Sequence, residues 1–164
     1  MIEPLTIGDI CTTRLVRIEA FSLTPHFRLA FEQVVGRALP DAGQGVEGPN
    51  GVLLWAEAKA WLVEGDASVL EAGLGDVAAV SDVSGAWRRI DIKGSAWRTM
   101  MTIEGLLDVE SATFKTGSLA ASLQHHAPVM LHVVSDAGLS IYTAPSFAHH
   151  LHTALHKAAR RLAA

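Results

Sequence analysis

The sequence predicts an α+β fold in which helices pack on antiparallel sheets. Short apolar stretches bounded by glycine and proline recur along the chain and indicate strands, whereas two segments show the spacing of amphipathic helices. Short turns separate the strands near the C-terminus, as in antiparallel hairpins. At 164 residues the chain fits one core. We therefore expect a single domain over residues 1–164, with two sub-halves divided near residues 75–80.

The N-terminal region is predicted to hold a strand, a helix and a loop. Residues 4–20 alternate between apolar and charged side chains, which indicates a strand. Thr24 is expected to cap a helix with Pro25 at its first position and Gly36 at its end. The helix has a core-facing stripe of Phe27, Phe31, Val34 and Val35. Residues 39–51 are dense in turn formers and predict a loop.

Two short strands and a short helix are expected next. Residues 52–55 and 60–63 are apolar, and four residues join them. Asp66 then caps a helix that ends at Gly73 or Gly75.

The central stretch predicts a strand–turn–strand–helix unit. Residues 77–83 and 87–92 are expected to pair as a hairpin across the turn between them. The helix expected from Gly94 to about Ile103 would then pack on one face of this hairpin.

The C-terminal region predicts three strands and a helix. The strands are expected at residues 117–124, 129–134 and 139–142, with a turn at 135–138. A helix over residues 146–162 ends the chain.

Composition narrows the class of function. The net charge is −4, and no basic run is longer than an Arg-Arg pair, so the chain offers few positive charges to neutralise a nucleic-acid backbone. No apolar run approaches 18 residues and no basic-then-apolar leader begins the chain, so we expect a cytoplasmic protein without an export signal. Hydrophobic residues make up 49% and charged residues 18%, which favours a buried interface with another chain or self-association when alone.

No motif in the sequence predicts an active site. Cys11 is the only cysteine, so an internal disulfide is excluded, and we expect it to be a partly buried small hydrophobe. Neither G-x-G-x-x-G nor G-K-[ST] occurs. Asp82 and Asp91 could form a carboxylate pair for acid–base chemistry, but Asp82 is expected instead to accept amide hydrogen bonds in a turn. We assign no catalytic, cofactor-binding or metal-binding residue to the chain.

Histidine is the one enriched residue with functional potential. The chain has eight, including His125-His126 and a group on the final helix. On that helix His149, His152 and His156 fall on one side, which Arg160 extends. The opposite, core-facing stripe is Phe147, Leu151, Leu155, Ala158 and Leu162. A solvated face, contact with a partner and a metal site all remain open for the histidines.

The four tryptophans are expected to be core residues in the main. They are Trp55, Trp61, Trp87 and Trp97. Because tryptophan is also enriched at protein interfaces, we add Trp87 and Trp97 to His149, His152, His156 and Arg160 as the expected partner-contact residues.

An ordered series of short motifs resembles one known family. The series is Val80-Ser-Asp-Val-Ser84, Trp87-Arg-Arg-Ile90, Gly94-Ser-Ala96, Leu107-Asp108, Phe114, Gly117, Pro128-Val-Met-Leu131 and Ala144-Pro-Ser-Phe-Ala148. Over roughly residues 50–160 it resembles the gamma subunit of heterotetrameric sarcosine oxidase. The chain departs from that pattern at Pro145, where the family has Arg, at Ser95, where it often has Pro, and over residues 54–63.

The resemblance implies both a fold and a role. The fold would be part of the folate-binding aminomethyltransferase module, that of the glycine-cleavage T-protein. The role would be that of a small structural subunit in a flavoenzyme that oxidatively demethylates sarcosine or a related N-methyl amino acid and passes the methyl carbon to tetrahydrofolate. FAD, FMN, NAD and tetrahydrofolate would sit on the larger flavoprotein subunits, its implied partners. A free-standing folate-binding aminomethyltransferase-like protein and a small His-rich metal-binding module remain alternatives, and whether the chain takes part in catalysis stays open.

Overall fold

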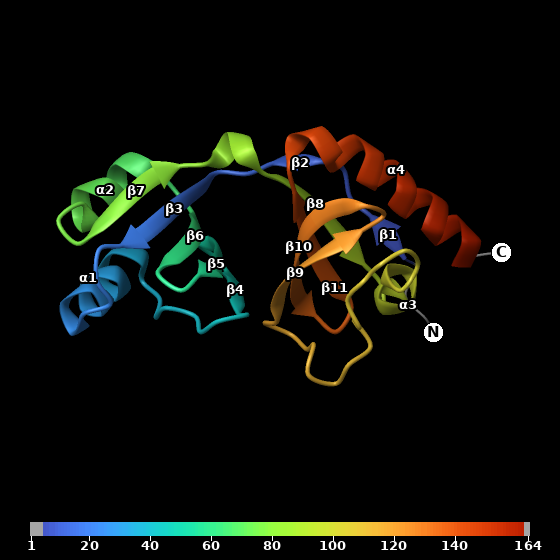
Figure 1. Ribbon diagram of the computed structural model, residues 1–164, viewed down its shortest axis with the longest axis horizontal. Coiled ribbons are helices and arrows are strands. Elements are labelled where there is room, and N and C mark those ends of the chain that lie inside the picture. The colour runs from blue at the N-terminus through green and yellow to red at the C-terminus, as the bar shows by residue number, and fades with distance from the viewer. Residues whose placement is uncertain (1–4, 163–164) are drawn as a thin grey trace. The chain divides into compact units, whose positions relative to one another are not determined.

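The computed structural model describes residues 5–162, which form two compact units (Figure 1). Thr13–Gly85 make up one, here called the inserted unit. The described residues up to Thr12 and from Ala86 onward make up the other, the flanking unit. Each unit holds an antiparallel sheet and its own helices, so the predicted α+β class is confirmed. The single-domain assignment stays a prediction.

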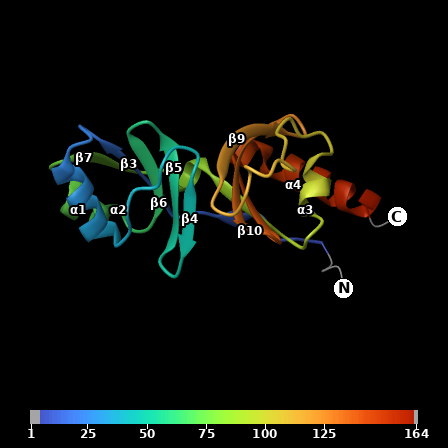
Figure 2. The same cartoon turned by 90° about the horizontal axis from the view of Figure 1, so that it is seen from below.

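The inserted unit is a five-stranded sheet in the order β4-β5-β6-β3-β7. Its elements are β3 (Leu15–Ala20), α1 (Pro25–Val35), β4 (Gly45–Gly48), β5 (Gly51–Glu57), β6 (Ala60–Glu64), α2 (Ala67–Leu74) and β7 (Ala78–Asp82). The two helices lie side by side against this sheet (Figures 1 and 2). The predicted β5–β6 hairpin is confirmed.

The helix ends of the inserted unit follow from the sequence. The Phe27 amide donates to Thr24 Oγ1 at 3.1 Å, and the Ser68 amide donates to Asp66 Oδ1 at 2.9 Å. Gly36 ends α1 with a φ of 73°, a conformation that only glycine adopts at little cost. The predicted caps are confirmed.

Three aromatic rings lie at the centre of this unit. Phe27 and Phe31 from α1 and Trp61 from β6 have ring centroids 5.8 to 6.0 Å apart in tilted arrangements. All three are buried, and the Trp61 indole N–H donates to the Pro40 carbonyl at 3.3 Å. Aromatic pairs in such geometry add about 0.5–1.5 kcal/mol to what burial contributes. The apolar stripe that the sequence predicts on α1 therefore faces the core of this unit.

The flanking unit is a six-stranded sheet with two helices. Its main strand order is β1-β8-β11-β10-β9, and β2 also pairs with β8. The elements are β1 (Thr6–Ile7), β2 (Cys11–Thr12), β8 (Arg88–Lys93), α3 (Trp97–Met101), β9 (Leu119–Gln124), β10 (Ala127–Ser135), β11 (Gly138–Thr143) and α4 (Pro145–Leu162), and a 3₁₀ turn at Ser84–Ala86 spans the boundary between units. The predicted antiparallel order of the last three strands is confirmed.

Helix α4 packs on this sheet through one stripe. Leu151, Leu155 and Ala158 are buried in a cluster with strand residues such as Ile90 and Leu131. Phe147 and Leu162 are 37% and 40% exposed, so their assignment to the core is wrong. Both lie in the terminal turns of α4, at the edge of the packed face.

The predicted central hairpin is also wrong. β7 pairs with β3 in the inserted unit, whereas β8 pairs with β11, β1 and β2 in the flanking unit. Local patterning marked both strands, but each pairs with strands distant in the chain: β7 is an edge strand beside β3, and β8 lies between β11 and the short strands β1 and β2. An isolated two-stranded hairpin would be only marginally stable.

Smaller differences concern strands and helix lengths. β4 lies within the stretch expected to be a loop, and α3 is shorter than the helix expected from Gly94. The expected first strand is divided into β1, β2 and β3. Cys11 is exposed rather than partly buried, because it lies on the short strand β2 at the margin of the sheet. Among residues 5–162 no helix is long and apolar enough to cross a membrane.

Candidate functional site

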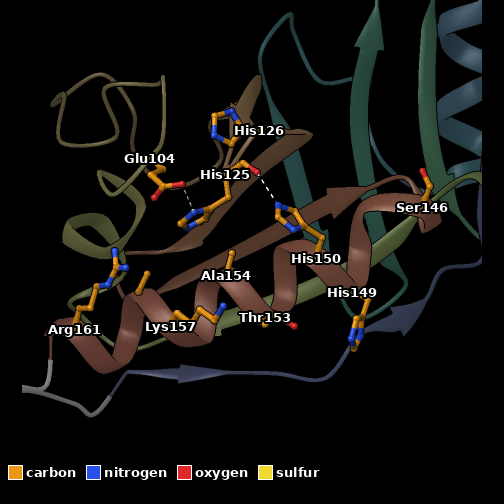
Figure 3. Close-up of a pocket in the computed structure, with 11 residues that line it drawn as sticks. Glu104, His125, His126, Ser146, His149, His150, Thr153, Ala154, Lys157 and Arg161 are labelled. Atoms are coloured by element: carbon orange, nitrogen blue, oxygen red, sulfur yellow. Dashed lines mark hydrogen bonds and ion pairs between the residues drawn. The ribbon is translucent and has the colours of Figure 1, made fainter.

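A groove of about 750 Å³ runs along α4 in the flanking unit (Figure 3). Its other wall is made by the β9–β10 turn and by the loop that follows α3. The lining residues are Glu104, His125, His126, Ser146, His149, His150, Thr153, Ala154, Lys157, Ala158 and Arg161. Four of the eight histidines of the chain therefore border one groove.

The β9–β10 turn places two of these histidines by an unusual backbone. Gln124 pairs with Ala127, so His125 and His126 are the two turn residues, with φ angles of 48° and 64°. Positive φ at both positions is the mark of a type I′ hairpin turn, for which Asn-Gly is the favoured sequence. Glu104, with a φ of 54°, is the third such residue. Within residues 5–162 these three are the only non-glycine residues with positive φ.

Glu104 and His125 form a hydrogen-bonded pair. His125 Nδ1 lies 3.1 Å from Glu104 Oε2, and the His125 amide donates to the Glu104 carbonyl at 3.0 Å. The side-chain hydrogen bond from His125, followed by its charge, lowers the pKa of the Glu104 carboxyl below its ordinary value. A carboxylate only accepts, so Nδ1 carries the proton. The His125 ring is 6% exposed, and its Nε2 has no hydrogen-bond partner in the described chain.

His150 connects α4 to the same turn. Its Nε2 lies 3.0 Å from the His125 carbonyl oxygen, and because a carbonyl only accepts, this nitrogen donates (Figure 3). One further contact holds the loop after α3 in place, since Gln124 Nε2 donates to the Ile103 carbonyl at 2.7 Å. Backbone and side-chain hydrogen bonds therefore hold both walls of the groove.

The groove is rich in cationic and imidazole groups. Lys157 and Arg161 are exposed on α4, and neither forms an ion pair within the described residues. Glu104 is the single carboxylate among the lining residues, and it already accepts from His125. Chemically, the site suits the binding of negatively charged groups, and its lining contains neither a cysteine nor an aromatic ring other than imidazole.

The structure divides the expected histidine stripe between two places. His149 and Arg160 are exposed, whereas His152 and His156 are half-buried with ring centroids 4.6 Å apart. His152 Nε2 donates to the Gly8 carbonyl at 3.1 Å. His152 and His156 therefore do not share the solvent exposure of His149, because the N-terminal segment of the flanking unit packs beside them. Their expected contact with a partner stays a prediction. Within residues 5–162 no group of three or more His, Cys, Asp or Glu side chains is arranged to hold a metal ion.

The other expected residues have structural surroundings. Trp97 is fully buried and its indole N–H donates to the Asp136 carbonyl at 3.0 Å, so within this chain it is a core residue, and its expected partner contact stays a prediction. Trp87 is half-buried. Asp82 accepts from the Ser84 amide at 2.9 Å, as predicted for a turn. Asp91 instead accepts from Ser140 Oγ at 2.7 Å, so the two aspartates belong to separate networks.

Sequence reasoning missed the groove because its residues are far apart in the chain. Glu104, Lys157 and Arg161 carry no motif, and only the fold brings them to one place. The strands expected at 117–124 and 129–134 leave four residues between them, whereas the structure leaves only His125 and His126 in the turn, the length of a tight hairpin.

An antiparallel α+β protein with a polar groove is the class that the fold and this site define. No family model matches the chain, and no curated protein matches it by sequence. Among solved structures it is similar to a chain of the heterotetrameric sarcosine oxidase from Corynebacterium sp. U-96, solved in complex with pyrrole 2-carboxylate. The TM-score is 0.83 at 19% identity, and the match covers 98% of this chain and 86% of that chain. The resemblance inferred from the sequence is thus confirmed at the level of the fold.

Two further solved structures are more distant. They are the regulatory subunits of aspartate kinase from Thermus thermophilus and Thermus flavus, with 14% and 17% identity. Each match covers 96% of this chain and 99% or 97% of the other, with a TM-score of 0.47.

Proposed function

We propose that this chain is a small, non-catalytic subunit of a heterotetrameric sarcosine oxidase-type enzyme, equivalent to the gamma subunit. The observation that carries the proposal is the fold likeness, with a TM-score of 0.83 over 98% of this chain. The match also takes in 86% of the neighbour's chain, so that neighbour is itself a small chain rather than a piece of a large flavoprotein subunit.

The surface of the chain supports a role in an assembly. Large apolar side chains are exposed in both units, including Phe21 at 61%, Leu29 at 58% and Leu106 at 76%. Apolar side chains left at a surface gain about 25 cal/mol per Å² when another surface covers them. In this proposal the larger subunits cover them, flavin and folate chemistry belongs to those subunits, and this chain supplies structure.

The two alternatives have less support. A free-standing folate-binding aminomethyltransferase-like protein is expected to line its pocket with a carboxylate and an aromatic ring, and the groove offers Glu104 without a Phe, Tyr or Trp. A metal-binding module needs converging ligands, and His149, His152 and His156 have different surroundings, as described above.

Co-expression tests the proposal directly. The chain is produced alone and together with the larger flavoprotein subunits that the proposal names as its partners, and size-exclusion chromatography with light scattering gives the mass of each product. We expect self-association of the chain alone, no bound flavin, and a defined complex with one copy per assembly in the presence of the partners. A monodisperse monomer that ignores the co-expressed subunits would contradict the proposal, as would stoichiometric flavin on the chain alone.

A further inference from the structure

One face of α4 presents a row of polar and cationic side chains along the groove. His150, Thr153, Lys157 and Arg161 are exposed and follow the three- and four-residue spacing of a single helix face. From Ser146 to Arg161 the helix rises by about 22 Å. The face is therefore much longer than a single small anion.

The charge of this face is opposite to that of the chain as a whole. The chain carries a net charge of −4, yet the groove has Lys157, Arg161 and four histidines against one carboxylate. That carboxylate, Glu104, is held by His125. A concentration of donors and positive charge on an otherwise acidic protein selects a negatively charged partner and orients it on approach.

A second, independent observation points to an occupant. The His125 ring lies in the wall of the groove, between Glu104 and α4 (Figure 3). It is more than nine-tenths buried, and its Nε2 lacks any partner in residues 5–162, which is rare for a buried polar atom. Because Nδ1 donates to Glu104, Nε2 is the polar atom of this ring that is left for an occupant of the groove.

The backbone around the groove is strained as well. Glu104, His125 and His126 all have positive φ, and all three border the groove. Such conformations of non-glycine residues cluster at ligand-binding and switch regions, where the surrounding structure holds them. The coincidence of strain, an unpartnered nitrogen and clustered cations marks this groove as a binding site.

We propose that the groove binds an extended acidic segment, rich in Asp or Glu, of a partner chain. An extended segment that spans about 22 Å has six or seven residues at roughly 3.3 Å each. Its carboxylates would meet Lys157 and Arg161 at one end and His150 and the His125–His126 turn farther along. A nucleic-acid backbone is the less favoured occupant, because the net charge of −4 repels a long polyanion beyond the groove. The inference rests on the proposed subunit role and identifies where a partner is held.

The binding test uses the full chain and a defined probe. Fluorescein-labelled hexaglutamate is titrated into the wild-type protein, and its anisotropy is measured at low and high salt. The double variant Lys157→Glu with Arg161→Glu reverses two exposed charges of the groove. Arg28→Glu with Lys59→Glu, also exposed but in the inserted unit, makes the same change in net charge. Circular dichroism verifies that both variants are folded.

We expect hexaglutamate to bind the wild type and the control variant alike, and the groove variant roughly tenfold more weakly, with salt reducing all binding. A Glu104→Gln variant removes the competing carboxylate and is expected to bind at least as tightly as the wild type. Equal binding by the groove and control variants overturns the proposal. Tighter binding of a single-stranded oligonucleotide than of hexaglutamate overturns it in favour of nucleic acid, and full competition by inorganic phosphate at equal concentration overturns it in favour of a small-anion site.

Assembly of the complex separates this inference from the proposed function. If the wild-type chain fails to join the co-expressed flavoprotein subunits, the subunit role fails, whatever the peptide result. If the wild type and the groove variant both join to the same extent, the subunit role stands and the acidic-segment site fails. If the wild type assembles and only the groove variant fails to do so, the result supports both the subunit role and the acidic-segment site.

Discussion

The inserted and flanking units are both antiparallel sheets with packed helices, but they differ in the residues that occupy left-handed backbone positions. In the inserted unit the left-handed position at the end of α1 is occupied by Gly36, and side chains of Thr24 and Asp66 cap both helices. In the flanking unit left-handed positions are occupied by Glu104, His125 and His126. The inserted unit thus follows local preference, whereas the flanking unit departs from it at the groove. Departures from local preference with no gain in packing are typical of binding sites.

The largest losses of stability are expected from substitutions in the hydrophobic cores, which both units have. Replacing Phe27 by Ala is expected to lower the free energy of unfolding by about 3–5 kcal/mol, and Leu155 by Ala by about 2–5 kcal/mol, because each removes a fully buried side chain. His149 is exposed, and His149→Ala should change the free energy of unfolding by less than about 0.5 kcal/mol. Urea unfolding followed by circular dichroism gives the values. A loss at His149 equal to that at Leu155 would mean that α4 is turned differently.

Exchanging the residues at left-handed positions should have opposite effects in the two units. His126→Gly relieves a φ of 64° and is expected to raise the free energy of unfolding by about 1 kcal/mol. Gly36→Ala places a side chain at a φ of 73°, and no atom lies within 4 Å of the new Cβ. Backbone strain alone is therefore expected to lower the free energy of unfolding by about 1–2 kcal/mol. Thermal and urea unfolding measure both changes. If His126→Gly destabilises the protein, the turn is not strained.

The smallest expected effect is a pH dependence confined to the flanking unit. Burial, followed by the charges of His152 and Arg160, lowers the pKa of His156 below its ordinary value of 6.5, while Asp9 acts in the opposite direction. The unfolded chain therefore binds a proton at His156 at a higher pH than the folded chain, and stability should fall as the pH drops below about 6.5.

His156→Gln tests this pH effect, since the amide does not titrate. We expect the fall in stability between about pH 7 and pH 5 to become shallower in this variant, as measured by urea midpoints across that range. His26→Gln, at an exposed position of α1, is the matched control for the removal of one imidazole. An equal change of slope in both variants would mean that His156 has no special surroundings.

The comparison also explains which parts of the candidate site were predictable. The strands on either side of His125 and His126 were recognised, and so was α4, because each has a local hydrophobic period. Helical spacing alone does not tell which polar face of α4 a neighbouring segment covers, and the partner contacts expected on α4 stay a prediction. His152 lies against Gly8, and this contact joins residues at opposite ends of the chain.

Local chemistry in the sequence determined the α+β class, the capped helices of the inserted unit and the order of the last three strands. These features depend on neighbours within one helical turn or one hairpin, so a short window holds the information. Only the tertiary structure decided that β7 and β8 belong to different sheets and that Glu104, His125, Lys157 and Arg161 share a groove. The reason is physical: strand pairing and side-chain convergence are set by burial across the whole fold, which no local window contains.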